Sequence, residues 1–236
     1  MGRLSEAQRE AFERDGYLVA QDAISPEQLA ALRDQLDGWV EESRGHDRPF
    51  GETIDKLPRF DIAPEHSGAA PALRRVNNPA EVSESYAEVA LDSAVVDMVA
   101  DLIGPDIKFH HGKLNVKLPG TGTRVDYHQD FPYTPHSNDD IVTALLMLDD
   151  MTLENGCLMV VPGSHREGLK SLWQDDRFTG KVDRQTEQDA IRRAVPVTGR
   201  AGGVCLMHTA LLHSSAANGS SRRRALFINV YTAADA

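Results

Sequence analysis

The amino-acid sequence predicts a mainly β fold with flanking helices, in which antiparallel strands form a sandwich or jelly roll. From Asp106 onward, short apolar segments are separated by explicit turn sequences such as Pro119–Gly122. These segments show no regular alternation of strands and helices, which argues against a parallel sheet. Helical periodicity dominates the chain before that point. We therefore expect one domain over residues 1–236, with a helical N-terminal part at about 1–104 and a jelly-roll core at about 105–232.

The composition is that of an acidic globular protein. The chain has 236 residues, of which 41% are hydrophobic and 26% are charged, and its formal net charge is −11. This negative balance argues against nucleic acid or an anionic membrane as a partner, because both bind positive surfaces. No apolar run reaches the ~20 residues that span a bilayer, and residues 1–7 lack the apolar segment of a secretory signal. Cys157 and Cys205 lie in apolar segments, so we expect free buried thiols and a cytoplasmic location.

Two N-terminal helices have clear start signals. Ser5 is the expected cap of a helix that ends near Arg14. Ser25–Gln28 has the pattern of a capping box with proline at the first helical position. The core-facing residues of the second helix recur at helical spacing: Leu29, Leu32, Leu36, Trp39 and Val40. Further helices are expected around residues 83–90 and 93–103.

The remaining elements are a lid and a series of short strands. Residues 41–71 are rich in Gly, Pro, His and charge, which predicts a loop or lid. Its available anchors are Phe50, Ile54, Leu57, Phe60 and Ile62. The expected strands are Tyr17–Val19, Ile107–Leu118, Val125–Asp130, Ile141–Leu148, Cys157–Val161, Gly203–His208 and Arg224–Thr232. The polar residues 178–193 predict a surface excursion or a helix.

A His-x-Asp pair, His128 and Asp130, carries the first chemical signal. In an extended strand, residues i and i+2 project from the same face about 7 Å apart, so the imidazole and the carboxylate can reach one metal ion. A third ligand from a distant segment would complete two histidines and one carboxylate, with the other coordination positions open. That set is typical of non-haem Fe(II) oxygenases. His208 and His213 both qualify as the third ligand, and spacing alone does not choose between them.

Arg224 directly precedes an apolar strand and follows His213 by eleven residues. A core strand can carry an arginine inward only if an anion meets it, and pleat alternation puts Arg224 on the face of Leu226 and Ile228. Arg224 is therefore the expected clamp for a co-substrate carboxylate. A solvated basic turn at Arg222–Arg224 is the alternative.

Several motifs together resemble the phytanoyl-CoA dioxygenase family. They are Val125–Asp130, Leu153–Leu158, Val161–His165, and His213–Ser215 with Arg224 eleven positions further on. The resemblance extends over about residues 5–232 and is strongest over 105–230. It implies a double-stranded β-helix, the jelly roll of the cupins, with flanking N-terminal helices. It also implies an Fe(II)- and 2-oxoglutarate-dependent dioxygenase that consumes O2.

The resemblance assigns roles to individual residues. It implies that His128, Asp130 and His213 are the iron ligands, which leaves a structural or supporting role for His208. It also implies that Arg224 binds the distal carboxylate of 2-oxoglutarate. The hydroxyl partner of that arginine would then be Ser215, two residues beyond the third ligand.

A second group of residues is assigned more loosely. The strand before the His-x-Asp turn matches the family around Lys113, which implies contact with 2-oxoglutarate, and Arg75 lies near a basic residue that the family places on the co-substrate. By pleat parity, one face of this strand carries His111, Lys113, Asn115 and Lys117. His111 and Asn115 are candidate substrate contacts, unless the stripe is a solvated strand face. Tyr133 is a candidate wall of the substrate pocket or a core aromatic.

The expected reaction is hydroxylation of a small-molecule metabolite with release of succinate and CO2. Family members that halogenate lack a carboxylate at the position of Asp130, so its presence favours hydroxylation. A CoA thioester fits poorly, because no basic cluster besides Arg222–Arg224 is available for its phosphates. One alternative is a cupin-type non-redox isomerase or hydrolase, which would not need Arg224. Another is a non-catalytic small-molecule-binding jelly roll, in which a metal ligand would be expected to be lost. The oligomeric state is unknown from the sequence.

Overall fold

The computed structural model of the chain describes residues 2–120 and 123–236. Its helices are α1 (Glu6–Asp15), α2 (Pro26–Ser43), α3 (Glu84–Leu91), α4 (Ala94–Ile103) and α5 (Arg184–Arg193), with 3-10 turns η1 (Pro79–Glu81), η2 (Phe131–Tyr133) and η3 (Ser164–Arg166). The N-terminal strands are β1 (Tyr17–Ala20), β2 (Phe50–Glu52), β3 (Pro58–Ile62) and β4 (Leu73–Asn77). The later strands are β5 (Ile107–Lys117), β6 (Val125–His128), β7 (Ile141–Met147), β8 (Leu158–Val160), β9 (Trp173–Gln174), β10 (Arg177–Phe178), β11 (Val195–Val197), β12 (Val204–His208), β13 (His213–Ser215) and β14 (Arg224–Ala233).

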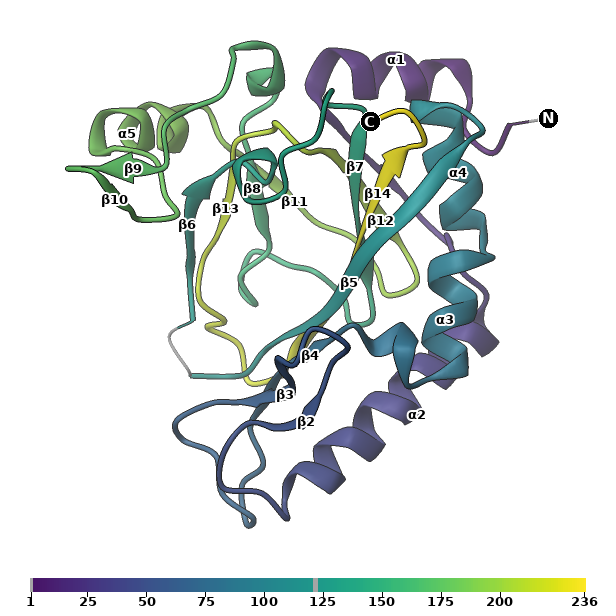
Figure 1. Cartoon of the computed structure of the whole chain (residues 1–236), viewed down its shortest axis with the longest axis vertical. Coiled ribbons are helices and arrows are strands. Elements are labelled where there is room, and N and C mark those ends of the chain that lie inside the picture. Colours follow the sequence, from purple (N-terminus) through teal and green to yellow (C-terminus); the bar gives the residue numbers. More distant parts are fainter. Residues whose placement is uncertain (1, 121–122) are drawn as a thin grey trace.

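Two antiparallel sheets form the β core. The large sheet has the order β1-β12-β7-β14-β5-β4-β3-β2, and the small sheet has the order β11-β8-β13-β6. Helices α1 to α4 lie along one side of the large sheet, and α5 with the β9–β10 ribbon lies on the opposite side of the molecule (Figure 1). This arrangement confirms the predicted mainly β fold with flanking helices.

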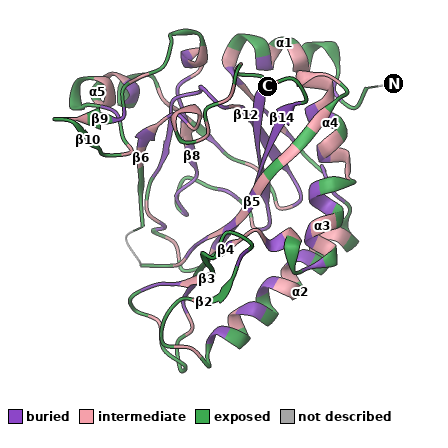
Figure 2. Cartoon of the chain, in the orientation of Figure 1, coloured by how far each residue is buried: buried purple, intermediate pink, exposed green. Residues whose placement is uncertain are grey.

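Strand β7 shows how the large sheet separates two hydrophobic cores. All of its residues are buried, because helices cover one face of the sheet and the small sheet covers the other (Figure 2). Ala144 and Leu146 pack in the cluster that includes α2, α3 and α4. Leu145 and Met147, on the other face, pack in the cluster between the sheets. Thr143 has the same parity as this inner pair and therefore also points between the sheets.

The two N-terminal helices begin as predicted. The Ser5 hydroxyl accepts a hydrogen bond from the Gln8 N–H at 3.3 Å, and the Gln8 side chain accepts one from the Ser5 N–H. Ser25 and Gln28 form the same reciprocal pair at the start of α2. These capping boxes satisfy N–H groups that have no partner within the helix. They fix where each helix starts against the sheet.

The predicted loop or lid at residues 41–71 is wrong for residues 50–62, whereas residues 44–49 and 63–71 lie outside helices and strands as expected. A role as a lid stays a prediction. Over residues 50–62, strands β2 and β3 pair as a hairpin, and β4 joins that hairpin to β5 of the large sheet. Phe60 and Ile62 are buried as expected of anchors, whereas Ile54 and Leu57 are 84% and 60% exposed. The reason is that the turn between β2 and β3, residues 53–57, contains neither Gly nor Pro, and the two strands are too short for a period of two to stand out.

Other differences concern the ends and number of the strands. The first 104 residues contribute β1 to β4 to the large sheet, so this part is mixed and not purely helical. The sequence did not indicate β9, β10, β11 or β13, and β6 ends at His128 instead of Asp130. The expected turn at Pro119–Gly122 includes residues 121 and 122, which lie outside the described residues. The shared sheet supports a single domain, which stays a prediction. Within the described chain, no helix is both long and apolar enough to cross a membrane.

Candidate functional site

His128, Asp130 and His213 meet between the two sheets. Strands β6 and β13 pair so that His213 lies opposite His128, with 4.2 Å between the imidazole centroids. The Asp130 Oδ1 atom lies 3.5 Å from His128 Nε2 and 3.7 Å from His213 Nε2. One ligand atom from each residue falls within 4.8 Å of the others. The donor set fits a divalent iron ion bound on one side, with the remaining positions open to other ligands.

A turn, and not a continuous strand, brings Asp130 to this position. The backbone leaves the strand after His128, and Asp130 adopts φ −74° and ψ −33° at the start of η2. The Asp130 N–H donates to the Thr209 carbonyl at 2.9 Å. The expectation that His128 and Asp130 share one face of a strand is therefore wrong, whereas the expectation that both reach one metal position is supported by the distances.

Both histidines are held in the tautomer that a metal requires. His128 Nδ1 lies 2.9 Å from the Asp126 carbonyl oxygen, and His213 Nδ1 lies 2.9 Å from the Leu211 carbonyl oxygen. A carbonyl oxygen can only accept, so each Nδ1 carries the hydrogen. Each Nε2 then presents its lone pair toward Asp130, as in metal-bound histidines generally.

Two polar residues that sequence reasoning missed support the ligands. Thr143 Oγ1 donates to Asp130 Oδ2 at 3.0 Å, which leaves Oδ1 directed at the histidines. Gln129, which lies between His128 and Asp130 in the sequence, is fully buried. Its side-chain amide donates to the Ala210 carbonyl at 2.6 Å and accepts from the Lys170 N–H at 2.7 Å. A threonine at an inward position of the otherwise apolar β7 was the signal that could have identified Thr143.

The protonation states of the ligands also suit a cation. Burial alone raises the pKa of the Asp130 carboxyl, but His213, His128 and Lys113 together hold it well below its ordinary value. Burial and the neighbouring His128 lower the pKa of the His213 imidazole to about 4. At neutral pH the carboxyl is therefore ionised and this imidazole is neutral, which are the forms that bind a metal.

Arg224 lies on the inner face of β14, as predicted, and it is only 4% exposed. Its Nε has no hydrogen-bond partner. The nearby Asp149 carboxylate pairs with Arg33 and Arg223 instead, and no ion pair joins Arg224 to a carboxylate of the described residues. Burial lowers the pKa of its guanidinium to about 10. Because an isolated buried charge is costly, this arginine requires an anion that the protein itself does not supply.

Lys117 places a second buried cation beside Arg224. The two residues are direct partners in the β5–β14 ladder, and Lys117 is 5% exposed. Its ammonium donates to Ser215 Oγ at 2.8 Å and to the Ala216 carbonyl. Burial, and then the charge of Arg224, lower the pKa of Lys117 to about 7. The Ser215 hydroxyl, which was expected to be the partner of Arg224, thus accepts from Lys117 instead. The sequence placed Lys117 on this face of the strand but assigned it no role.

The three candidate metal ligands, Arg224 and Lys117 all line one cavity of about 370 Å³. Each of the ten residues singled out from the sequence lines it: Arg75, His111, Lys113, Asn115, Tyr133, His128, Asp130, His213, Ser215 and Arg224. Tyr133 is 48% exposed and so lies at the rim. His208 does not line this cavity, and its Nε2 lies 3.7 Å from Asp139 Oδ2 instead. The structure therefore favours His213 over His208 as the third ligand.

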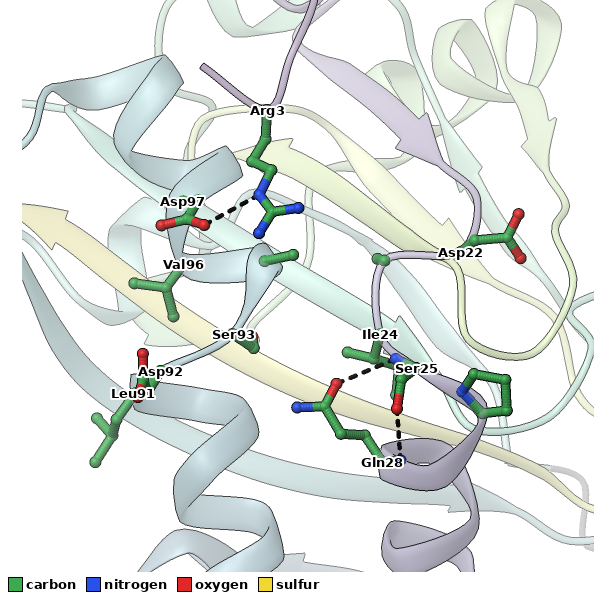
Figure 3. Close-up of a pocket in the computed structure, with 13 residues that line it drawn as sticks. Arg3, Asp22, Ile24, Ser25, Gln28, Leu91, Asp92, Ser93, Val96 and Asp97 are labelled. Atoms are coloured by element: carbon green, nitrogen blue, oxygen red, sulfur yellow. Dashed lines mark hydrogen bonds and ion pairs between the residues drawn. The ribbon is translucent and has the colours of Figure 1, made fainter. Parts of the chain in front are cut away.

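A second hollow, of about 580 Å³, lies where the N-termini of α2 and α4 approach each other (Figure 3). Arg3 pairs there with Asp97 at 3.2 Å, and Ser25 and Gln28 form the α2 capping box. Among the described residues, the only group of three side chains that could hold a metal ion lies elsewhere, at His128, Asp130 and His213. This hollow is a junction between helices whose polar groups serve helix ends.

Comparison with known proteins places this cavity in a family. The model of the family described as phytanoyl-CoA dioxygenase (PhyH) matches residues 12–226. A probable alpha-ketoglutarate-dependent hypophosphite dioxygenase from Stutzerimonas stutzeri is 29% identical, over 98% of this chain and 79% of its own length. An ectoine dioxygenase from Sphingopyxis alaskensis is 28% identical, over 98% of this chain and 76% of its own.

Solved structures of similar fold point to the same enzyme class. EctD from S. alaskensis with bound Fe has a TM-score of 0.79 at 26% identity, covering 98% of this chain and 77% of its own. The same protein with 2-oxoglutarate and 5-hydroxyectoine has a TM-score of 0.76 at 28% identity, covering 98% and 76%. The predicted jelly roll, enzyme class and cofactors are thereby confirmed. The chain belongs to the phytanoyl-CoA dioxygenase family, and it is an iron- and 2-oxoglutarate-dependent dioxygenase.

Proposed function

We propose that this chain hydroxylates a small-molecule metabolite, with His128, Asp130 and His213 as the iron ligands and Arg224 as the anchor of 2-oxoglutarate. The observation that carries the proposal is the buried, unpaired guanidinium of Arg224 in the same cavity as the three ligands. A non-redox isomerase or hydrolase of the cupin type has no use for such a cation. Bound iron and 2-oxoglutarate would together supply the oxidation by O2, with release of succinate and CO2.

The residues around Arg224 form the co-substrate end of the cavity. Arg224 and Lys117 are adjacent cations, and both face the space into which a distal carboxylate would fit. The Ser215 hydroxyl accepts from Lys117 and is held at the same place. Charge-assisted hydrogen bonds from two cations would fix the orientation of the keto acid relative to the metal. Lys117 is therefore added to the predicted co-substrate residues.

The residues around Lys113 form the other end. His111, Lys113 and Asn115 follow one another on the inner face of β5, and Arg75 donates to Asn115 Oδ1 at 3.1 Å. His111, Asn115 and the rim residue Tyr133 are assigned to the substrate, as predicted. Lys113 and Arg75, which the resemblance places on 2-oxoglutarate, are reassigned to the substrate or to its boundary with the co-substrate, because Lys117 supplies the second cation beside Arg224. Apolar side chains of β7, β12 and β14 line the wall between these ends and would exclude water from the metal: Leu145, Met207, Leu226, Ile228 and Val230.

The size of the cavity limits the substrate. A volume of about 370 Å³ is near the lower end for ligand pockets, and 2-oxoglutarate must share it with the substrate. The substrate is therefore a compact metabolite and not a CoA thioester. The names of the relatives, which specify hypophosphite, ectoine and L-proline, agree with a small substrate.

The test uses the whole chain loaded with Fe(II) without oxygen. Addition of 2-oxoglutarate should produce a weak visible metal-to-ligand charge-transfer band, and admission of air should produce succinate. His213→Ala should lose the band through loss of iron, whereas His208→Ala should keep both, since His208 lies outside the cavity. An iron-loaded wild-type chain with neither band nor succinate would contradict the proposal.

A further inference from the structure

The cavity is basic although the protein is acidic. The chain carries a formal net charge of −11, but five cationic side chains line the cavity: Arg74, Arg75, Lys113, Lys117 and Arg224. Among the described lining residues, Asp130 is the only carboxylate. Such an inversion of charge inside a concave site concentrates the field and selects ligands of the opposite sign.

Four of these cations form no ion pair with a carboxylate of the described residues, although the Asp130 carboxylate lies near enough to Lys113 to oppose the lowering of its pKa by burial. Arg74 pairs with Asp61 at 2.8 Å, but no ion pair joins Arg75, Lys113, Lys117 or Arg224 to a carboxylate in the described parts of the chain. Arg75 is instead held by its Nε hydrogen bond to Asn115. That contact leaves the terminal nitrogens of its guanidinium available to another acceptor.

Cofactor and co-substrate do not restore neutrality. Burial lowers the pKa of Lys117 to about 7 and also lowers that of Lys113. Even with both lysines neutral, Arg75, Arg224 and iron would bring four positive charges, whereas Asp130 and the two carboxylates of 2-oxoglutarate supply three negative charges. The excess remains whichever cation each carboxylate contacts. With Arg224 and Lys117 at one end of β5, the remaining cations are Lys113, two residues before Asn115 on β5, and Arg75, which pairs with Asn115 from β4. Lys113 is only half-exposed, so water screens its charge incompletely.

We propose that the substrate is a small anion, whose carboxylate or phosphorus oxyanion is bound by Lys113 and Arg75. This inference rests on the proposed function and specifies its substrate class. Arg75 offers a planar pair of donors, Lys113 offers a point charge, and Asn115 positions the guanidinium between the strands. Arg75 is exposed and needs no partner by itself, but an anion would gain charged hydrogen bonds from both side chains that a neutral substrate would not, and a cationic substrate would be repelled.

The test measures binding without turnover. The chain is loaded with Fe(II) and saturating 2-oxoglutarate under anaerobic conditions, and the charge-transfer band is followed as small probes are added. Propionate, propionamide and propylammonium have nearly the same size and differ in charge; hypophosphite represents the phosphorus oxyanions. We expect at least one anion to perturb the band at a concentration about tenfold below that of the amide, because hydrogen bonds to charged partners are stronger. Whichever anion binds more tightly identifies the type of oxyanion.

Variants separate this inference from the proposed function. Lys113→Met and Arg75→Gln should abolish the preference for the anion while the band with 2-oxoglutarate still forms. Lys108→Met is the matched control: Lys108 is an exposed lysine on β5 that does not line the cavity, and its loss should leave the preference intact. A wild-type chain that forms the band but binds the amide or the ammonium as well as the anions would overturn the inference alone. Failure of the band itself would instead contradict the proposed function.

Discussion

Lys117 and Arg224 are direct cross-strand partners on β5 and β14, and both are almost completely buried. Two cations in neighbouring positions repel each other, and burial adds to the cost of each. The protein holds Lys117 with Ser215 and the Ala216 carbonyl, which are neutral acceptors. This pair is therefore a site that an incoming carboxylate stabilises, and its charge state should govern the affinity for 2-oxoglutarate.

The affinity for 2-oxoglutarate should depend on pH through Lys117. The groups that face its ammonium are Arg224, Cys157, Ser215 and the Ala216 carbonyl, and burial with the Arg224 charge lowers its pKa to about 7. Below pH 7 the ammonium is already charged and affinity should be constant. Above pH 7 binding must take up a proton, so affinity should fall by up to about tenfold per pH unit.

Anaerobic titrations from pH 6 to pH 9 test this dependence. Lys117→Met should bind more weakly and without the decline, because no proton is taken up. Lys117→Arg should keep the affinity and also lose the decline, because a guanidinium stays charged throughout this range. The same decline in the methionine variant would show that another group titrates.

Arg224→Gln should weaken 2-oxoglutarate binding by about 10- to 100-fold and leave iron affinity nearly unchanged. The reason is that a charged hydrogen bond is lost at the distal carboxylate, far from the metal ligands. Arg223→Gln is the control, since Arg223 points the other way and pairs with Asp37 and Asp149. Equal losses of iron and 2-oxoglutarate in the Arg224 variant would indicate a structural arginine instead.

Thr143→Val should reduce Fe(II) affinity by about 10- to 100-fold, the usual effect of removing a partner of a metal ligand. The substitution keeps the shape of the side chain and removes the 3.0 Å hydrogen bond to Asp130. Thr209→Val is the matched control, because the buried Thr209 hydroxyl has no hydrogen-bond partner among the described residues. Competition with a chelator measures both variants, and identical affinities would contradict the supporting role of Thr143.

Gly156→Ala should destabilise the fold by more than Gly168→Ala does. Both glycines have a positive φ, +75° and +77°, which costs an alanine about 1–2 kcal/mol. A Cβ at Gly156 would also collide with the carbonyl oxygens of Ala216 and Ala217, whereas nothing lies within 4 Å of one at Gly168. Urea unfolding gives the two free energies. Equal losses would show that the carbonyls move aside freely.

The parts of the site that the sequence predicted are those set by residue type and strand parity. Arg224 shares a face with Leu226 and Ile228 because β14 is a regular strand, and the stripe from His111 to Lys117 follows from the same rule on β5. Local rules also sufficed for the helix starts, since Ser5 needs only its own next three residues to form a cap.

The parts that the sequence did not predict depend on contacts between distant segments. The turn at Asp130 is stabilised by the Thr209 carbonyl, 79 positions away, and nothing within Val125–Asp130 specifies it. The same is true of Ser215, whose hydroxyl meets Lys117 only because β13 folds over the end of β5. Strands of two or three residues, such as β13, are too short to show a period.

Strand β5 sets the separation between the two ends of the cavity. Its pleat advances about 7 Å for every two residues, so Lys113 and Lys117 are anchored about 13 Å apart along one rigid strand, with Asn115 midway. The register of β5 against β14 fixes this spacing, because a slip of β5 would also displace Lys117 from Arg224. Substitution at position 113 is therefore the way to alter one end of the cavity without disturbing the end that holds Lys117 and Arg224.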